Sequence, residues 1–154
     1  VMPQMRAEMY PDRDAISDLL ALAFGGTSEA RLIEMLRRDG HLALSLVAEA
    51  AGTIIGHVAL SPIVADIPAL ALAPVAVHPA MQGRGIGAAL IRAAQKNFED
   101  HALIVLGEPE YYSRFGFAPV DLVSPYAGPY LQGTGCEALP AGSRIAHAPA
   151  FSMI

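Results

Sequence analysis

The sequence lacks the features that mark disulfide-rich, membrane-spanning and nucleic-acid-binding proteins. Its single cysteine, Cys136, cannot form a disulfide within the chain, which fits a reducing cytoplasm. No apolar run reaches the roughly 18 residues that a membrane helix needs, and the first residues lack the basic and apolar blocks of a secretory leader. The formal net charge of −5, with only one lysine, is opposite to that of a general nucleic-acid binder.

We therefore expect a cytoplasmic protein that binds neither membranes nor nucleic acids. The histidines lack metal-ligand spacing, so no metal is expected either. The 154 residues suffice for one domain but not two, and no repeat or linker divides them. Residues 1–154 are interpreted as a single domain, with a core of about 3–139 and an irregular, proline-containing tail at 140–154.

Hydrophobic periodicity and turn residues predict a mixed α/β protein. The first helix should bury Ile16, Leu19, Leu20, Ala23 and Phe24 on one face. Strands are expected at about 3–9, 42–50, 53–61, 70–77, 102–107, 117–123 and 130–139, and helices at about 13–24, 28–39, 85–98 and 109–116. The predicted order of elements is therefore β-α-α-β-β-β-α-β-α-β-β.

Acidic residues are absent from the window 67–98, although the protein as a whole is acidic. This window contains Arg84, Arg92 and Lys96 and therefore carries a net charge of +3. A positive segment of this kind is suited to an anionic ligand.

Three glycines within this window, Gly83, Gly85 and Gly87, lie where a strand gives way to a helix. The first amides of a helix have no internal partner, and the helix dipole places positive charge there. Without Cβ atoms, these positions let phosphate oxygens approach the backbone, and Arg84 adds a charged donor. A tight turn with positive φ would also explain glycine, but three at alternate positions favour a phosphate or pyrophosphate site.

The same residues satisfy a relaxed dinucleotide fingerprint, Gly83-x-Gly85-x-x-Ala88, so a nicotinamide-binding protein is an alternative. Three observations count against it. Residues 78–82 separate the glycines from their strand, the unit lies in mid-chain, and the nearest acidic residue at a strand end, Glu108, is too far along. No Gly-Lys-Ser/Thr occurs, which excludes a Walker-type loop.

Residues 82–87, Gln-Gly-Arg-Gly-Ile-Gly, resemble the Gln/Arg-x-x-Gly-x-Gly/Ala signature of the GCN5-related N-acetyltransferases (GNAT). Residues 111–117, YYSRFGF, resemble a second segment of that family, and the order of elements agrees over about 3–139. The similarity is closest to the YhbS-like branch of predicted acetyltransferases. It implies one GNAT domain with a mixed, mostly antiparallel sheet flanked by helices and a splay between the fourth and fifth strands.

The resemblance implies that acetyl-CoA is the co-substrate. Pro74 cannot donate to a strand ladder and is consistent with a bulge where the fourth strand leaves the fifth. In the family, backbone groups after this bulge bind the pantetheine arm and polarise the thioester carbonyl, and the glycine loop holds the pyrophosphate. The expected cofactor-binding residues are Val75, Ala76, Val77, Gln82, Gly83, Arg84, Gly85, Ile86, Gly87 and Ala88.

Tyr112 occupies the position of the family's general acid, which protonates the leaving thiolate. Tyr111 lies about 100° further round a helix and cannot face the same sulfur; a merely packed Tyr112 is the alternative interpretation. No general base is assigned. The positions that carry it in several family members are alanines here, and the candidates left open are Glu49, His57, Asp66, Glu108 and a water chain.

The resulting hypothesis is an acetyl-CoA-dependent N-acetyltransferase in which a primary amine attacks the thioester directly. The acidic residues outside the glycine loop hint at a cationic acceptor such as a polyamine, an aminoglycoside or a lysine side chain. A non-catalytic acyl-CoA-binding module with the same fold is the alternative. The sequence is compatible with a homodimer but identifies neither the acceptor nor the oligomeric state.

Overall fold

The computed structural model describes residues 3–154 and contains a seven-stranded sheet in the order β1-β2-β3-β4-β5-β8-β6. The strands are β1 (Gln4–Ala7), β2 (Leu44–Ala50), β3 (Thr53–Ile63), β4 (Ala69–Val77), β5 (Ala102–Leu106), β6 (Ala118–Pro119), β7 (Leu122–Val123), β8 (Leu131–Thr134) and β9 (Ser143–Arg144). The helices are α1 (Arg13–Phe24), α2 (Ser28–Arg38), α3 (Ile86–Asn97) and α4 (Pro109–Ser113), with 3-10 turns η1 (Tyr10–Asp12), η2 (Pro79–Met81) and η3 (Pro149–Met153).

The predicted order of elements is confirmed from β1 to α4. The predicted strand at 117–123 is instead divided into β6, which pairs with β8, and β7, which pairs with β9 in a separate two-stranded parallel sheet. Strand β6 ends at Pro119, and the chain leaves the main sheet after a last hydrogen bond from the Val120 amide to the Leu131 carbonyl.

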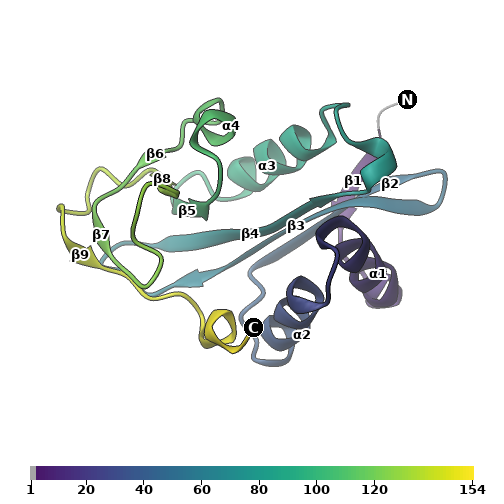
Figure 1. Cartoon of the computed structure of the whole chain (residues 1–154), viewed down its shortest axis with the longest axis horizontal. Helices are drawn as coiled ribbons and strands as arrows, with labels where there is room; N and C mark the ends of the chain where they lie inside the picture. The colour runs from purple at the N-terminus through teal and green to yellow at the C-terminus, as the bar shows by residue number, and fades with distance from the viewer. Residues whose placement is uncertain (1–2) are drawn as a thin grey trace.

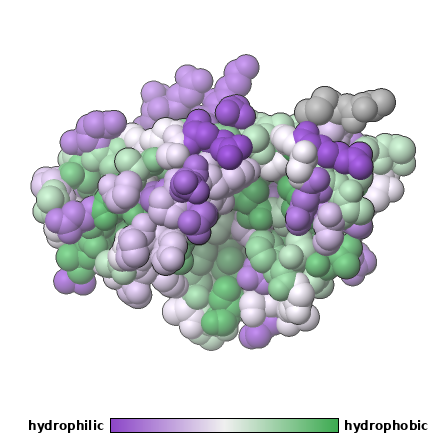
Figure 2. Space-filling view, turned by 45° about the horizontal axis from the view of Figure 1, so that its top comes forward, coloured by the Kyte–Doolittle hydropathy of each residue, from purple (hydrophilic) through white to green (hydrophobic). Residues whose placement is uncertain are grey.

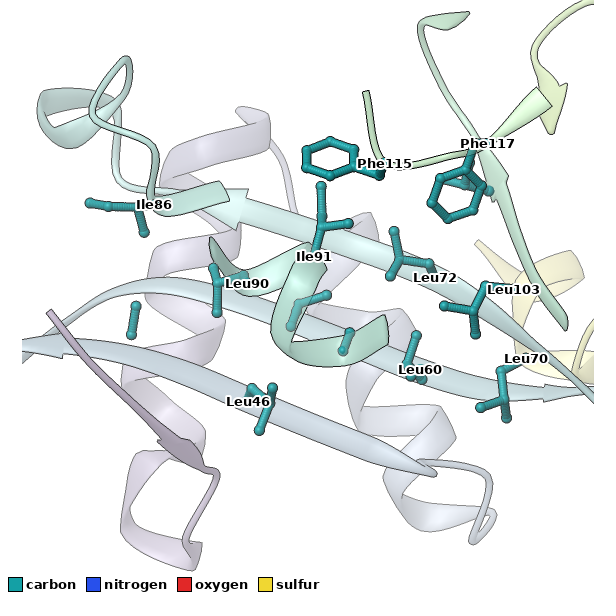
Figure 3. Packing of buried hydrophobic residues seen from close by; sticks show 14 of the residues in the cluster. Leu46, Leu60, Leu70, Leu72, Ile86, Leu90, Ile91, Leu103, Phe115 and Phe117 are labelled. Atoms are coloured by element: carbon teal, nitrogen blue, oxygen red, sulfur yellow. The ribbon is translucent and has the colours of Figure 1, made fainter. Parts of the chain in front are cut away.

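The helices cover both faces of the main sheet, with α3 and α4 on one side and α1 and α2 on the other (Figure 1). Because side chains alternate along a strand, neighbouring residues of β4 belong to different cores. Val75 and Val77 pack on the α3 side, whereas Ala76 is buried on the α1–α2 side. On the α3 side, Leu90 and Ile91 lie over strand residues that include Leu60 and Leu72, as Figure 3 shows.

The sheet parts along the second half of β4. The parallel ladder between β4 and β5 contains only the pairs from Ala69–Ala102 to Ala71–Ile104. The β3–β4 register shifts between Val58 and Leu60, so Ala73 and Pro74 both lie opposite Ala59. This is a β-bulge, which bends a strand and interrupts its pairing. The expected splay between the fourth and fifth strands is therefore confirmed, and the backbone of residues 72–77 on the β5 side has no strand partner.

One residue of the predicted buried face of the first helix is exposed. Phe24, expected inside, is 45% exposed because α1 ends at Gly25, whose φ of 72° turns the chain away. Within the predicted irregular tail at 140–154, Ile145, Ala148 and Ala150 are buried, and the C-terminal end lies beside α2 (Figure 1).

None of the helices within residues 3–154 has the length and apolar character of a membrane span. The surface nevertheless exposes apolar residues. Figure 2 shows one face on which apolar residues gather between more hydrophilic groups.

Candidate active site

One cavity, which we call the loop cavity, lies between the end of β4, the start of α3 and α4. Its volume is about 470 Å³. The lining residues are Val75, Val77, Met81, Gln82, Gly83, Gly85, Ile86, Gly87, Ala88, Tyr111, Tyr112 and Arg114. The structure therefore brings two distant sequence segments, 75–88 and 111–114, to one concave surface.

The glycine loop presents free backbone donors to this cavity. Gly83 and Gly85 have φ values of 76° and 81°, and Gly85 is the N-cap of α3. The first helical hydrogen bond runs from the Ala89 amide to the Gly85 carbonyl. The amides of residues 86–88 therefore have no partner among the described residues, as at the start of any helix, and with the helix dipole they can hold an anion.

The sequence left two explanations open for the three glycines, a tight turn with positive φ and an open backbone surface for phosphate, and the geometry is compatible with both. A Cβ at Gly83 or Gly85 would meet nothing within 4 Å, so glycine is needed there for its left-handed backbone. A Cβ at Gly87 would lie 3.2 Å from the Tyr111 hydroxyl, so the third glycine lets α4 approach α3. Turn geometry and an open amide surface thus coexist.

Tyr112 is held in a fixed position by its neighbours. Its ring packs against Tyr111, Phe115 and Phe117, and any Cβ at Gly107 would overlap it. Gln95 of α3 donates a hydrogen bond from Nε2 to the Phe115 carbonyl at 2.8 Å, which links α3 to the turn after α4.

The environment of Tyr112 keeps its phenol protonated. Burial, with a smaller contribution from Tyr111, raises the pKa of Tyr112 to about 12, because loss of water disfavours the phenolate. The side chain therefore remains a hydrogen-bond donor at neutral pH.

A second cavity, which we call the splay cavity, occupies the gap where β4 and β5 part and also measures about 470 Å³. It shares Val75 and Tyr112 with the loop cavity. The lining residues are Phe24, Glu29, Leu32, Ala71, Leu72, Ala73, Pro74, Val75, Ile104, Leu106, Tyr112, Tyr126, His147, Phe151 and Ile154. Tyr112 and Val75 therefore form a wall common to two cavities, one beside the glycine loop and one beside α2.

Not every predicted site residue lines these cavities. Arg84 is exposed and does not line the loop cavity. Ala76 does not line it either, since its side chain packs into the α1–α2 core.

The four open candidates for the base lie outside both cavities. Glu49 accepts a hydrogen bond from Arg6, and Asp66 and Glu108 are exposed on loops. His57 is fully buried beside Ser45, with 2.8 Å between Nε2 and Oγ. None of them faces Tyr112 across a cavity.

Sequence reasoning missed several lining residues. Met81, Tyr111 and Arg114 belong to the loop cavity, with Arg114 stacked over the Tyr111 ring at 4.7 Å; their adjacency to the two motifs was the available signal. Glu29 and His147 of the splay cavity had no such signal, because they come from helix and tail segments without a recognisable motif.

The geometry agrees with comparisons to known proteins. Residues 41–119 match the Acetyltransferase (GNAT) domain family. The uncharacterized N-acetyltransferase YhbS of Escherichia coli strain K12 is 37% identical over 120 residues, covering 73% of this chain and 72% of the relative. The chain therefore belongs to the GNAT acetyltransferase family and is an acyltransferase of that type, as the two motifs predicted.

Two solved structures share the complete fold. YhbS from Escherichia coli in complex with CoA superposes with a TM-score of 0.89 at 29% identity, covering 99% of this chain and 93% of the other. A GNAT family acetyltransferase from Brucella melitensis in complex with acetyl-CoA gives a TM-score of 0.83 at 31% identity, covering 96% and 97%. Both relatives thus bind a coenzyme A species.

No group of three or more His, Cys, Asp or Glu side chains within residues 3–154 is arranged to hold a metal ion.

Proposed function

We propose that this protein transfers the acetyl group of acetyl-CoA to a primary amine by direct attack on the thioester. The observation that carries the proposal is the wall shared by two cavities. The loop cavity offers an anion site for the diphosphate, the splay cavity offers room for an acceptor, and Tyr112 lies between them.

The pantetheine arm would follow the unpaired backbone of β4 from the glycine loop toward Tyr112. The amides at 86–88 would bind the diphosphate at the start of α3, and Arg114 adds a cation at the rim. Free backbone donors near Val75 would stabilise the oxyanion that forms at the thioester carbonyl, where fixed donors act most strongly.

The reaction forms a carbon–nitrogen bond and breaks a carbon–sulfur bond. The neutral amine attacks the carbonyl carbon, the tetrahedral intermediate collapses, and the thiolate takes a proton from the Tyr112 phenol. The nitrogen releases its surplus proton, which restores the phenol directly or through water, so that each turnover of the neutral amine yields an amide and a thiol with no net release of a proton.

A phenol with a pKa of about 12 is a weaker acid than a free thiol with a pKa near 8.5. Desolvation raises the pKa of the departing thiol in the same direction, which reduces the mismatch. Tyr112 would therefore act as a hydrogen-bond donor to the sulfur throughout and complete the transfer as the bond breaks.

The experiment is a comparison of two adjacent tyrosines. Tyr112→Phe should lower kcat about 100-fold or more, as loss of a general acid does, while acetyl-CoA affinity changes little. Tyr111→Phe is the matched control, because Tyr111 lines only the loop cavity, and its kcat should fall less than threefold. Equal losses in both variants would contradict the assigned role.

The rival functions give different results in the same assay. A non-catalytic acyl-CoA-binding module would be stabilised by acetyl-CoA in thermal melting but would release no thiol with any amine. A nicotinamide-binding protein would be stabilised by NAD and not by acetyl-CoA.

A further inference from the structure

The chemical character of the splay cavity limits the class of acceptor amine that it can bind. Most of its lining is hydrocarbon, contributed by α1, α2, β4, β5 and the C-terminal segment. Phe24, Leu106 and Ile154 are 45%, 54% and 45% exposed respectively, and all three line this cavity. Exposed apolar side chains gathered at a concave site are typical of a binding surface for an apolar group.

Glu29 is the one carboxylate side chain in that lining. The ion pairs of the described residues are Arg6–Asp12, Arg6–Glu49, Arg37–Glu8 and Arg38–Asp39. Glu29 therefore has no ion-pair partner within residues 3–154. Its place in the first turn of α2 favours a negative charge, so the carboxylate is available to a cationic ligand.

His147 adds a polar ring on the tail side of the cavity. It packs edge-on against Tyr126 and Phe151, with ring centroids 4.9 and 5.1 Å apart. Its Nδ1 is buried without a hydrogen-bond partner among the described residues. Burial lowers the pKa of His147, so the ring is neutral at neutral pH and can accept a proton.

We propose that the splay cavity binds a small primary amine with an apolar aryl or alkyl body, that Glu29 holds its ammonium group, and that His147 accepts its proton. The proposal rests on the acetyltransferase function above. The apolar lining favours such an amine over the polyamines and aminoglycosides that the overall charge suggested, because their many polar groups would be left without partners there.

The proton balance follows from the same residues. The ammonium first forms an ion pair with Glu29, and transfer of one proton to the neutral His147 ring leaves a free amine and an imidazolium. The amine then attacks the thioester carbonyl beyond Tyr112. The imidazolium returns its proton to solvent after the acetylated amine departs.

The experiment compares amine classes by thiol release, after thermal melting has established that acetyl-CoA binds. Phenethylamine and hexylamine represent the apolar class, and spermidine and kanamycin the polar polycations. We expect kcat/KM to be about 100-fold higher for the apolar class, because each buried methylene group favours binding. A preference for the polycations would overturn this inference and leave the proposed function standing. A protein that binds acetyl-CoA but acetylates neither class would overturn both.

Variants test the two polar residues separately. Glu29→Gln should raise KM for phenethylamine about 10- to 100-fold without changing KM for acetyl-CoA. Asp14→Asn is the matched control, since Asp14 lies in the first turn of α1 and lines neither cavity. An equal effect of both variants would show that Glu29 only stabilises its helix and does not bind the amine.

His147→Ala should lower kcat with phenethylamine, and added imidazole should restore part of the rate. Restoration is the informative readout, because loss of a purely structural ring would not be repaired by a free base. Failure of imidazole to restore any activity in a variant that melts like the parent protein would overturn the role of His147.

Discussion

The loop cavity and the splay cavity share two wall residues and have the same volume, but they are assembled differently. The loop cavity is formed by two short segments, 75–88 and 111–114, and its chemistry depends on free backbone amides. The splay cavity draws residues 71–75 from β4 and one to three side chains from each of α1, α2, β5, α4 and the tail, and its chemistry depends on those side chains.

This difference explains what each cavity can recognise. A backbone site at a helix N-terminus binds the same anion whatever the neighbouring side chains are, so it suits an invariant cofactor. A pocket of side chains from separate elements can change one wall at a time, so it suits an acceptor that differs among relatives. Because the two cavities are built from different groups, each can be perturbed separately, and the largest effect is expected at the start of α3.

Ala88→Asp should strongly weaken cofactor binding while leaving the fold intact. Ala88 lies in the first turn of α3 and lines the loop cavity, where an added carboxylate stabilises the helix but repels a diphosphate. Repulsion of about 2–4 kcal/mol weakens binding about 30- to 1000-fold. Isothermal titration with CoA measures the effect.

Ala88→Asn separates charge from size in that experiment. It adds a side chain of the same shape without the charge, so its loss of affinity should be much smaller. If the two variants bound CoA equally, the anion would not lie at the start of α3.

Gly107→Ala should displace Tyr112, which forms the wall between the cavities, and leave the other lining residues in place. The φ of Gly107 is not positive, so alanine is allowed by the backbone, but the new Cβ would overlap the Tyr112 ring. We expect kcat to fall about 10- to 100-fold as the phenol moves away from the sulfur, with a stability loss of about 1–3 kcal/mol.

Gly26→Ala is the control for the change at Gly107, because its Cβ would meet nothing within 4 Å. In a Tyr112→Phe background, Gly107→Ala should lower kcat little further, since both changes remove the same hydroxyl. Additive losses would show that Gly107 acts through another group.

Much of the fold and of the loop cavity could be predicted because the signals are local. The left-handed glycines, the acid-free window and the Tyr-Tyr-x-x-Phe-Gly-Phe segment each lie within a few consecutive residues. Pro74 marked the parting of β4 from β5, which the ladder confirms. The roles of all the predicted site residues remain predictions, and Ala76 and Arg84 in addition have no lining contact with the loop cavity.

The splay cavity could not be predicted because its residues meet only through tertiary packing. Phe24 looked like a core position from helical periodicity, but the turn at Gly25 places it at the cavity. His147 lies in a segment with short, irregular elements, and its contact with Tyr126 depends on how the tail returns to α2. No spacing rule connects Glu29 with a histidine 118 residues later.

His57 is a second histidine on the α2 side of the sheet, and a variant at this position tests which of the two histidines takes part in the reaction. It lies on the same face as the splay cavity but does not line it. Burial lowers its pKa to about 4, below the usual 6.5 of the unfolded chain. The unfolded state therefore binds more protons between these values, and stability declines as the pH falls through that window.

We expect this linkage to lower the free energy of unfolding by about 2 kcal/mol between pH 7.5 and pH 5, which denaturant unfolding at the two pH values would measure. His57→Gln should remove that part of the acid sensitivity and leave KM for the amine unchanged. Glu8, whose carboxylate accepts hydrogen bonds from Arg37 and Ser45, remains as a source of acid sensitivity in both proteins. A raised amine KM in this variant would place His57, rather than His147, in the acceptor site.

The smallest expected effect is a change in the alkaline part of the pH–rate profile. A tyrosine acid with a pKa near 10 would lose about three quarters of its activity by pH 10.5, whereas a pKa of about 12 preserves nearly all of it. Initial rates at saturating amine therefore differ about fourfold between the two cases at pH 10.5. Tyrosinate absorbance provides the independent measurement, because wild type and Tyr112→Phe should gain equal absorbance up to that pH and diverge only above pH 11. An earlier divergence would mean that water reaches the phenol, and that the wall between the two cavities is open to solvent rather than closed by packing.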